Sequence, residues 1–163
     1  MEENSEQLRN AMRFWATGIT VVTAAYEGMR HGMTVSSFTS VSLEPAQVLV
    51  SLQQNTRTHD LIMRSRAFGI NILNDNQKEI SDKFAGRIAD EENRLSQVET
   101  FKIRSNIPFI KGGMAHLECK VVTTIGSGTH TIFIGEVLEV VTSEQPAEPL
   151  IYYNRKYRTL SES

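Results

Sequence analysis

The chain has 163 residues, of which 40% are apolar and 22% are charged, and its 17 basic and 19 acidic residues give a formal net charge of −2. This composition is typical of a folded globular domain and excludes a disordered or fibrous chain. The length predicts a single domain over residues 1–163. Because no basic cluster is present, we expect no nucleic acid and no membrane surface as partner, and a small molecule is the expected ligand.

The cysteine count and the amino terminus both favour a cytoplasmic protein. Cys119 is the only cysteine, which excludes an intramolecular disulfide and makes a reducing compartment the simplest one. The first six residues include three glutamates and no basic residue, whereas a secretory signal would begin with basic residues. No apolar run approaches the roughly 18 residues that a membrane span needs. We therefore expect a soluble protein without a targeting segment.

The amino-terminal part predicts a helix followed by a hairpin. Apolar residues recur at helical spacing over residues 6–15, which indicates an amphipathic helix. Residues 19–25 are apolar and β-branched almost throughout and predict a strand. Glu27-Gly28 then separates this strand from residues 30–37, which is typical of a hairpin with a short turn.

The middle of the chain predicts strands that alternate with short helices. The apolar runs 48–52 and 67–73 are short and indicate buried strands. Thr56 is placed to cap a helix that ends near residue 64. An Asn-Asp-Asn turn after the second strand predicts another helix over residues 77–84. Pro45 closes a polar segment that precedes the first of these two strands.

The last part predicts one long hairpin and a tail. Residues 87–106 are highly charged and weakly periodic, which is typical of a mobile surface segment at the rim of a binding site. Residues 114–125 and 131–142 alternate as two long strands, joined across a Gly-Ser-Gly turn. Residues 152–157 form an aromatic tail. Six strands joined mostly by hairpins favour a mainly β protein with short helices, an antiparallel barrel rather than a doubly wound sheet.

Common catalytic and nucleotide-binding motifs are missing from the sequence. The Gly-x-Gly at 126–128 is followed by Thr131 instead of a third glycine, and by a strand instead of a helix, so a Rossmann site is disfavoured. Cys119 is expected to be a buried structural thiol rather than a nucleophile. His116 and Glu118 share the opposite face of the strand and are expected to form a surface pair, because two ligands are too few for a metal site.

Two features leave structural and functional interpretations open. The segment 32–42 carries many hydroxyls, which either bond their own backbone or offer neutral donors to a phosphate, a ribityl chain or a heterocycle. His130 lies beside two glycines at the lip of a hairpin, where an imidazole can reach a ligand, but a plain turn histidine fits the local sequence equally well. His31 and His59 are expected at the surface.

A series of segments in the same order resembles the short-chain flavin reductase family, the NAD(P)H:flavin oxidoreductases of two-component monooxygenases. The segments span about 140 residues, which makes their common order much more specific than any one of them. They are Phe14 to Thr23, Gly32 to Phe38, Ser40 to Pro45, Val48 to Leu52, Phe68 to Leu73, Ser81 to Ala85, Ala115 to Cys119, Gly128 to Val137 and Pro149 to Tyr153.

The resemblance implies a fold, a reaction and partners. The family fold is a flavin-binding split β-barrel of antiparallel Greek-key type, usually as a homodimer. The implied reaction is the reduction of FMN or FAD by NADH or NADPH, and the reduced flavin would go to a separate monooxygenase component. Two alternatives stay open: a flavoprotein of the same fold that holds FMN tightly and acts on another substrate, and a non-catalytic flavin-binding barrel.

The resemblance also implies site residues. His130 matches the position associated with nicotinamide binding, although Thr129 stands where aspartate is usual. Arg87, Arg94 and Arg155 are candidates to contact the 2′-phosphate of NADPH. In the implied flavin site, the ring and the ribityl chain lie along Thr34, Val35, Ser36, Ser37 and Ser40. Ser51 and Leu52 flank the ring, and Thr56 and Thr58 hold the phosphate. The pocket is completed by Lys83, Phe84 and Ala85.

Overall fold

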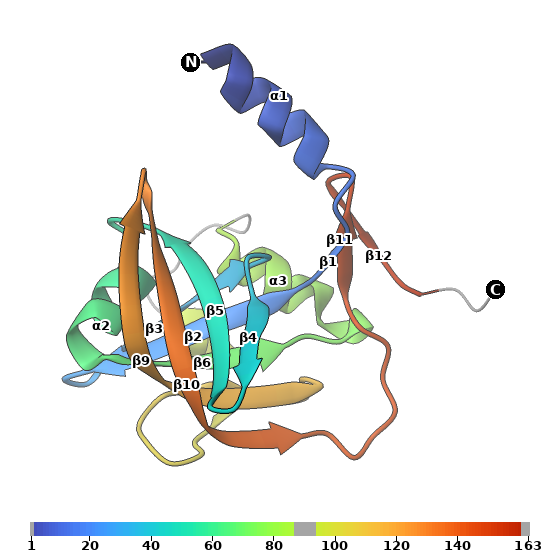
Figure 1. Cartoon of the computed structure of the whole chain (residues 1–163). Helices are drawn as coiled ribbons and strands as arrows, with labels where there is room; N and C mark the ends of the chain where they lie inside the picture. Colours follow the sequence, from blue (N-terminus) through green and yellow to red (C-terminus); the bar gives the residue numbers. More distant parts are fainter. Residues whose placement is uncertain (1, 87–93, 161–163) are drawn as a thin grey trace.

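The computed structural model describes residues 2–86 and 94–160 and has a seven-stranded antiparallel sheet at its centre (Figure 1). The sheet curls into a barrel, with the strand order β3-β2-β6-β9-β10-β5-β4. The predicted mainly antiparallel β fold is therefore confirmed. The strands are β2 (Thr20–Tyr26), β3 (Met29–Val35), β4 (Thr39–Leu43), β5 (Ala46–Gln53), β6 (Ala67–Ile72), β9 (Ala115–Ser127) and β10 (His130–Thr142).

Both predicted hairpins form where the turn residues allow a left-handed backbone. Glu27 and Gly28 have φ values of 48° and 80°, and they join β2 to β3 with Tyr26 opposite Met29. Gly128, with φ of 54°, lies in the turn between β9 and β10. Glycine adopts such values without steric cost, so the turn chemistry determined both registers.

The sequence did not predict strand β4. Its residues are mostly exposed, so the strand lacks the apolar alternation of a half-buried strand. β4 pairs with β5 from Thr39 opposite Leu49 to Leu43 opposite Ala46. β3 and β4 are the two edges of the sheet, and Ser36–Phe38 connect them directly. The gap between these two edges is termed the split, and the hydroxyl-rich segment crosses it.

Two helices pack on the barrel. α2 (Arg57–Ser65) begins at Thr56, whose side chain accepts a hydrogen bond from the backbone N–H of His59, and it packs on β2 and β3. α3 (Lys78–Phe84) follows the 3-10 turn η1 (Asp75–Gln77) and contacts β3. Both helices were predicted. No helix in the described ranges combines the length and the hydropathy that a membrane crossing needs.

The amino-terminal helix ends beside the carboxy-terminal hairpin. α1 (Glu2–Met12) projects away from the sheet and begins and ends a few residues earlier than predicted (Figure 1). β1 (Thr17–Gly18), β11 (Ile151–Tyr153) and β12 (Lys156–Arg158) form a separate three-stranded sheet next to it. The backbone N–H of Asn154 donates to the carbonyl of Arg13 at 3.0 Å, which ties the carboxy-terminal hairpin to the end of α1.

The barrel core is apolar and contains the single thiol. Phe68, Phe133 and Leu52 are fully buried in it, and the Phe68 ring packs against Gly135. Cys119 is also fully buried there, and burial raises the pKa of its thiol to about 12. The prediction of an inert structural cysteine is confirmed. Phe84 belongs to a second buried cluster under α3.

The predicted surface pair on β9 is wrong. His116 and Glu118 are buried, because the short hairpin of β7 (Thr100–Phe101) and β8 (Phe109–Ile110), which follows the 3-10 turn η2 (Arg94–Gln97), covers that face of the strand. The Glu118 carboxylate accepts hydrogen bonds from the backbone N–H groups of Arg104 at 2.8 Å and Ser105 at 3.4 Å. The His116 ring bonds the Ile110 carbonyl at 2.7 Å, and burial lowers the pKa of this histidine.

The same contacts revise the interpretation of residues 87–106 as a mobile surface segment. Residues 87–93 lie outside the described ranges. From residue 94 onward the segment is anchored, since Leu95 is buried and Thr100 pairs with Ile110. The high charge of the segment hid these anchors from a search for apolar periodicity.

Candidate functional site

Two of the hydroxyls at the split bond the protein backbone. Thr34 Oγ1 donates to the Ser81 carbonyl at 2.7 Å and so joins β3 to α3. Ser37 Oγ donates to the Ser51 carbonyl at 2.7 Å and accepts from the Ser51 N–H at 3.2 Å. β4 begins at Thr39, which lies opposite Leu49, so β4 does not pair with β5 beyond that residue. There the Ser37 side chain forms the hydrogen bonds to Ser51 that a strand partner would otherwise form.

Other predicted flavin contacts differ widely in exposure. Ser36 and Ser40 are exposed, and Ser51 is half-buried. Val35 and Leu52 belong to the barrel core, so they shape the site from beneath. At the end of α3, Phe84 is buried, Lys83 Nζ donates to Gln97 Oε1, and Ala85 is exposed.

The beginning of α2 contains a compact network of histidines and threonines. Thr56 caps the helix, and Thr58 is fully buried with its hydroxyl 2.8 Å from His31 Nδ1. His59 is buried, and its Nε2 lies 2.9 Å from the Thr131 hydroxyl. The predicted surface position of His59 is therefore wrong, whereas His31 is half-buried and lines a cavity. Helical periodicity would have found His59, because it lies three residues before the buried Ile62.

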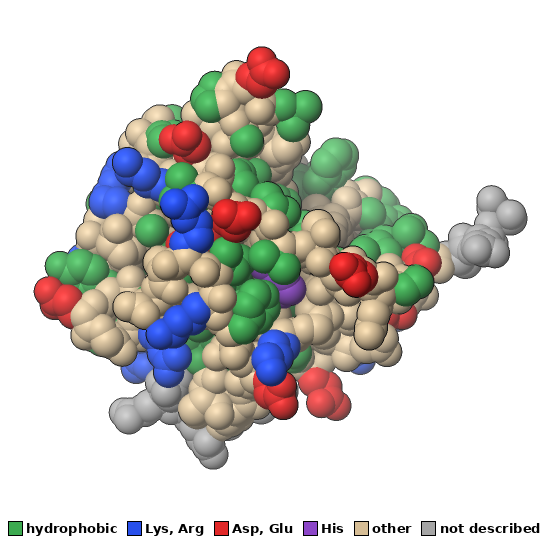
Figure 2. Space-filling model, turned by 90° about the horizontal axis from the view of Figure 1, so that it is seen from below, with side chains coloured by type: hydrophobic (Ala, Val, Ile, Leu, Met, Phe, Trp, Pro, Cys, Tyr) green, Lys and Arg blue, Asp and Glu red, His purple; other side chains and the backbone are tan. Residues whose placement is uncertain are grey.

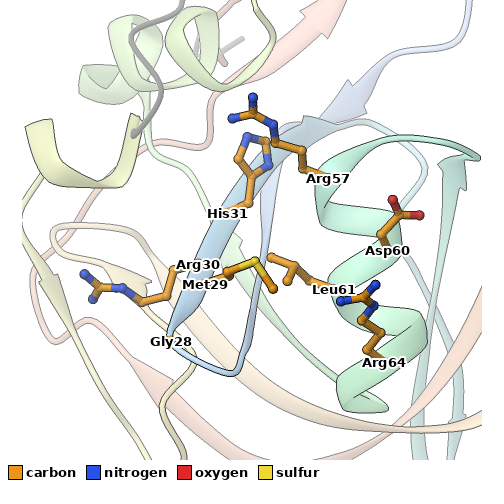
Figure 3. A pocket seen from close by; sticks show the side chains of 8 residues that line it. All are labelled: Gly28, Met29, Arg30, His31, Arg57, Asp60, Leu61 and Arg64. Carbon is orange, nitrogen blue, oxygen red and sulfur yellow. The ribbon is translucent and has the colours of Figure 1, made fainter.

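A cavity of about 590 Å³, termed the α2 cavity, lies between α2 and the β2–β3 hairpin. In Figure 3, the His31 and Arg57 side chains lie close together at one end, while Met29 and Leu61 face each other nearer the middle of the view. Lys and Arg side chains gather toward the left of Figure 2, the side on which Figure 1 draws this hairpin and α2. The lining residues are Gly28, Met29, Arg30, His31, Arg57, Asp60, Leu61 and Arg64.

A second cavity, of about 700 Å³ and termed the His130 cavity, lies beside the split. It contains Ser36 and His130, two residues that the sequence assigned to different ligands of one site. Arg155 lines it as well, whereas Arg94 donates to the Phe84 carbonyl at 3.2 Å and Arg87 lies outside the described ranges. The full lining is Leu8, Arg9, Met12, Arg13, Trp15, Ser36, His130, Tyr152, Asn154 and Arg155.

The His130 side chain is exposed and has a partner on the same turn. The hydroxyl of Thr129 lies 3.0 Å from His130 Nδ1. When this hydroxyl donates to Nδ1, the ring proton is on Nε2, which is then a donor toward an acceptor in the cavity. The backbone carbonyl of His130 accepts from Gln54 Nε2 at 3.0 Å, which fixes the turn against the end of β5.

The donor set suits a large neutral heterocycle that carries phosphates. Both cavities have the volume that is typical of cofactor-sized ligands. The split offers neutral hydroxyls and backbone groups, and both cavities add arginines, which bind phosphates. Within the described ranges, no three His, Cys, Asp or Glu side chains are close enough together to hold a metal ion. The arrangement therefore suits binding and orientation of a ligand that itself performs redox chemistry.

Comparison with known proteins gives concordant matches along the chain. A family model described as a flavin reductase-like domain matches residues 12–161. The chain is 38% identical over 156 residues to an NADH-dependent flavin reductase of Pseudomonas fluorescens, covering 94% of this chain and 89% of that protein. It is 33% identical over 159 residues to the reductase component of 4-hydroxyphenylacetate 3-monooxygenase from Thermus thermophilus, covering 95% and 96%.

A solved structure matches the fold over the same length. The NADH:FAD oxidoreductase of Streptomyces globisporus, in complex with NAD and FAD fragments, has a TM-score of 0.89 to this chain. The two proteins are 30% identical, and the match covers 99% of this chain and 95% of that one.

Proposed function

The chain belongs to the family of flavin reductase-like domains, and we propose that it oxidises NADH to reduce a flavin that then leaves for a separate monooxygenase. The predicted family, the split-barrel fold and the enzyme class, an NAD(P)H:flavin oxidoreductase, are confirmed by the matches. The NADH-dependent relative supports the hydride donor, and the monooxygenase reductase component supports the destination of the product. One observation carries the proposal: Ser36 of the split and His130 line a single cavity.

The flavin ring would lie along the split. The exposed hydroxyls of Ser36 and Ser40 would contact it directly, and Ser51 would flank it. Ser37 and Thr34 would act through the backbone groups that they already hold. When bound, the flavin accepts the hydride, so the chain has to supply orientation and polar contacts rather than a nucleophile or a general acid.

The flavin phosphate would lie at the first turn of α2. The N–H groups of this turn and the positive end of the helix dipole favour an anion. Arg57 is the first residue of the helix and lines the α2 cavity with His31. Thr58 would position the phosphate site through its hydrogen bond to His31. Lys83, Phe84 and Ala85, at the end of α3, would complete the flavin pocket.

The nicotinamide would lie against His130. With its Nε2 proton directed into the cavity, the imidazole would donate to the carboxamide oxygen and hold the ring over the flavin. The turn that carries His130 is fixed by Gln54, which supports a defined ring position. Because His130 is exposed, the nicotinamide would bind from solvent after the flavin.

We also propose that the chain forms one domain, that two copies form a homodimer, and that the protein works in a reducing cytoplasm. Apolar side chains are strongly exposed around α1, where Leu8, Phe14 and Trp15 are 62%, 77% and 66% exposed. A second copy that covers this surface would remove a cost of apolar hydration. Light scattering of the purified protein tests the dimer, and a monomer at all concentrations would contradict it.

The reaction is tested by following NADH and NADPH absorbance with no flavin, with FMN and with FAD. Turnover that requires added flavin, together with a colourless purified protein, is the expected result. Turnover without added flavin by a yellow protein would instead support the tightly bound FMN alternative. No turnover under any condition would support the non-catalytic barrel.

A matched variant tests the nicotinamide contact. His130→Ala is expected to raise KM for NADH roughly tenfold, because one directed hydrogen bond is lost, and to leave KM for flavin unchanged. An unchanged KM for NADH would remove His130 from the site. Thr129→Val should reproduce part of the effect, because it removes only the hydroxyl that orients the ring.

A further inference from the structure

The His130 cavity has a strongly basic rim. Arg9, Arg13 and Arg155 all line it, and its described lining includes no acidic side chain. Arg9 lies in the last turn of α1 and Arg13 directly follows the helix, and both face the cavity. Arg155 reaches the cavity from the opposite end of the chain. Three guanidinium groups around one cavity indicate a ligand with more than one negative charge.

Arg13 is held in place by the fold, but part of its side chain has no partner. Its backbone carbonyl accepts from the Asn154 N–H at 3.0 Å, which fixes the residue at the junction of α1 and the carboxy-terminal hairpin. The Nε atom of Arg13 is buried and has no hydrogen-bond partner within the described residues. A buried donor without a partner is costly and points to an acceptor supplied by a ligand.

Arg155 occupies a position where the fold favours glycine. It follows Asn154 in the two-residue turn between β11 and β12. The φ value is 47° at Asn154 and 60° at Arg155. Such turns prefer Asn-Gly, because a side chain on a left-handed backbone is strained. An arginine at this position therefore costs conformational free energy, and the stability of the turn does not explain why arginine stands there instead of glycine.

We propose that these three arginines bind the diphosphate of the pyridine nucleotide whose nicotinamide lies at His130. This inference rests on the proposed function and extends it, because it makes α1 and the carboxy-terminal hairpin parts of the substrate site. A dinucleotide diphosphate carries two negative charges and accepts the paired hydrogen bonds that guanidinium groups donate.

Arg155→Gly is the sharpest test, because it removes the guanidinium and relieves the strained backbone together. The expected result is a KM for NADH raised roughly tenfold, with kcat and the KM for FMN unchanged and the melting temperature equal or higher. A residue that merely stabilised the turn would lower the melting temperature and leave the KM for NADH unchanged.

Arg66→Gly is the matched control. Arg66 also has a left-handed backbone, with φ of 57°, but it caps α2 outside the cavity and bonds Thr124 on β9. The control loses the same charge from the same backbone conformation. The KM of this variant for NADH should therefore stay at the wild-type value. An equal rise of this KM in both variants would mean that the effect comes from the change in net charge, and would overturn the proposal.

Binding of ADP-ribose separates this inference from the proposed reaction. ADP-ribose has the diphosphate and adenosine but no nicotinamide, so its affinity, measured by calorimetry, does not depend on turnover. The wild type and Arg66→Gly should bind it, and Arg155→Gly and Arg13→Gln should bind it roughly tenfold more weakly. Equal affinity in all four proteins would overturn the inference even if NADH oxidation is normal.

The diphosphate of FAD is the competing source of the same chemistry. If Arg155→Gly raises the KM for FAD but not for FMN or NADH, the arginines bind the flavin and the inference is wrong. If the KM for NADH rises to the same extent with either flavin, the pyridine nucleotide is the ligand.

Discussion

Replacing Ser37 by alanine should destabilise the barrel at the split, whereas the same change at Ser36 should not. The Ser37 hydroxyl makes two hydrogen bonds to the backbone of Ser51, at 2.7 and 3.2 Å. A neutral hydrogen bond of this kind contributes about 1 kcal/mol net, so Ser37→Ala should lower the free energy of unfolding by about 2 kcal/mol. For a chain of this size, that lowers the melting temperature by about 4–8 °C.

Thermal unfolding and urea titration of both variants measure this difference directly. Ser36 is exposed, so Ser36→Ala should change stability by less than about 0.5 kcal/mol while raising the KM for flavin or NADH. Ser37→Ala should also raise the KM for flavin, because the Ser51 backbone is no longer held. Equal melting temperatures for the two variants would refute the assignment of Ser37 as the side chain that holds the end of β5.

Three further predictions concern the buried groups. Gly135→Ala would place a methyl group 2.6 Å from the Phe68 ring and should cost about 1–3 kcal/mol by urea unfolding, whereas Gly126→Ala, with open space around it, should be nearly neutral. Because burial raises the pKa of Cys119 to about 12, iodoacetamide should leave the folded protein unmodified at about pH 8 and add one group only after denaturation, as read by mass spectrometry. Burial lowers the pKa of His116 below its ordinary value of 6.5, so the unfolded chain takes up a proton that the folded chain does not. The free energy of unfolding should therefore decrease as the pH falls below about 6.5, and His116→Gln should remove part of that decrease in urea titrations at several pH values.

Strong local signals made most of the fold predictable. The Glu27-Gly28 turn, the Thr56 cap and the long alternating strands each depend on residues close in sequence, and each element formed where it was expected. β4 was missed because an exposed edge strand has no apolar alternation. The burial of Glu118 was missed because the cover comes from a distant and charged segment, which local patterns do not reveal.

The candidate site was predictable in its residue types but not in its assembly. The hydroxyl-rich segment and His130 were identified from the sequence, and they line a common cavity through Ser36. Arg155 was a candidate contact of the pyridine nucleotide, but no motif indicated that α1 and the carboxy-terminal hairpin complete one cavity, since Arg13 and Arg155 are far apart in the chain. The structure shows their proximity through the hydrogen bond between Asn154 and Arg13 and through the pairing of β1 with β11.

The split has a consequence for the rate at which a ligand exchanges. β3 and β4 are joined through Ser36–Phe38 but do not pair with each other, so the barrel wall has a seam there that is held by side chains such as Ser37. A ligand that enters or leaves along this seam breaks no strand-to-strand hydrogen bonds, and its dissociation is not limited by partial unfolding of the sheet. For an enzyme that releases reduced flavin, such a permanent opening means that product release needs no rearrangement of the sheet.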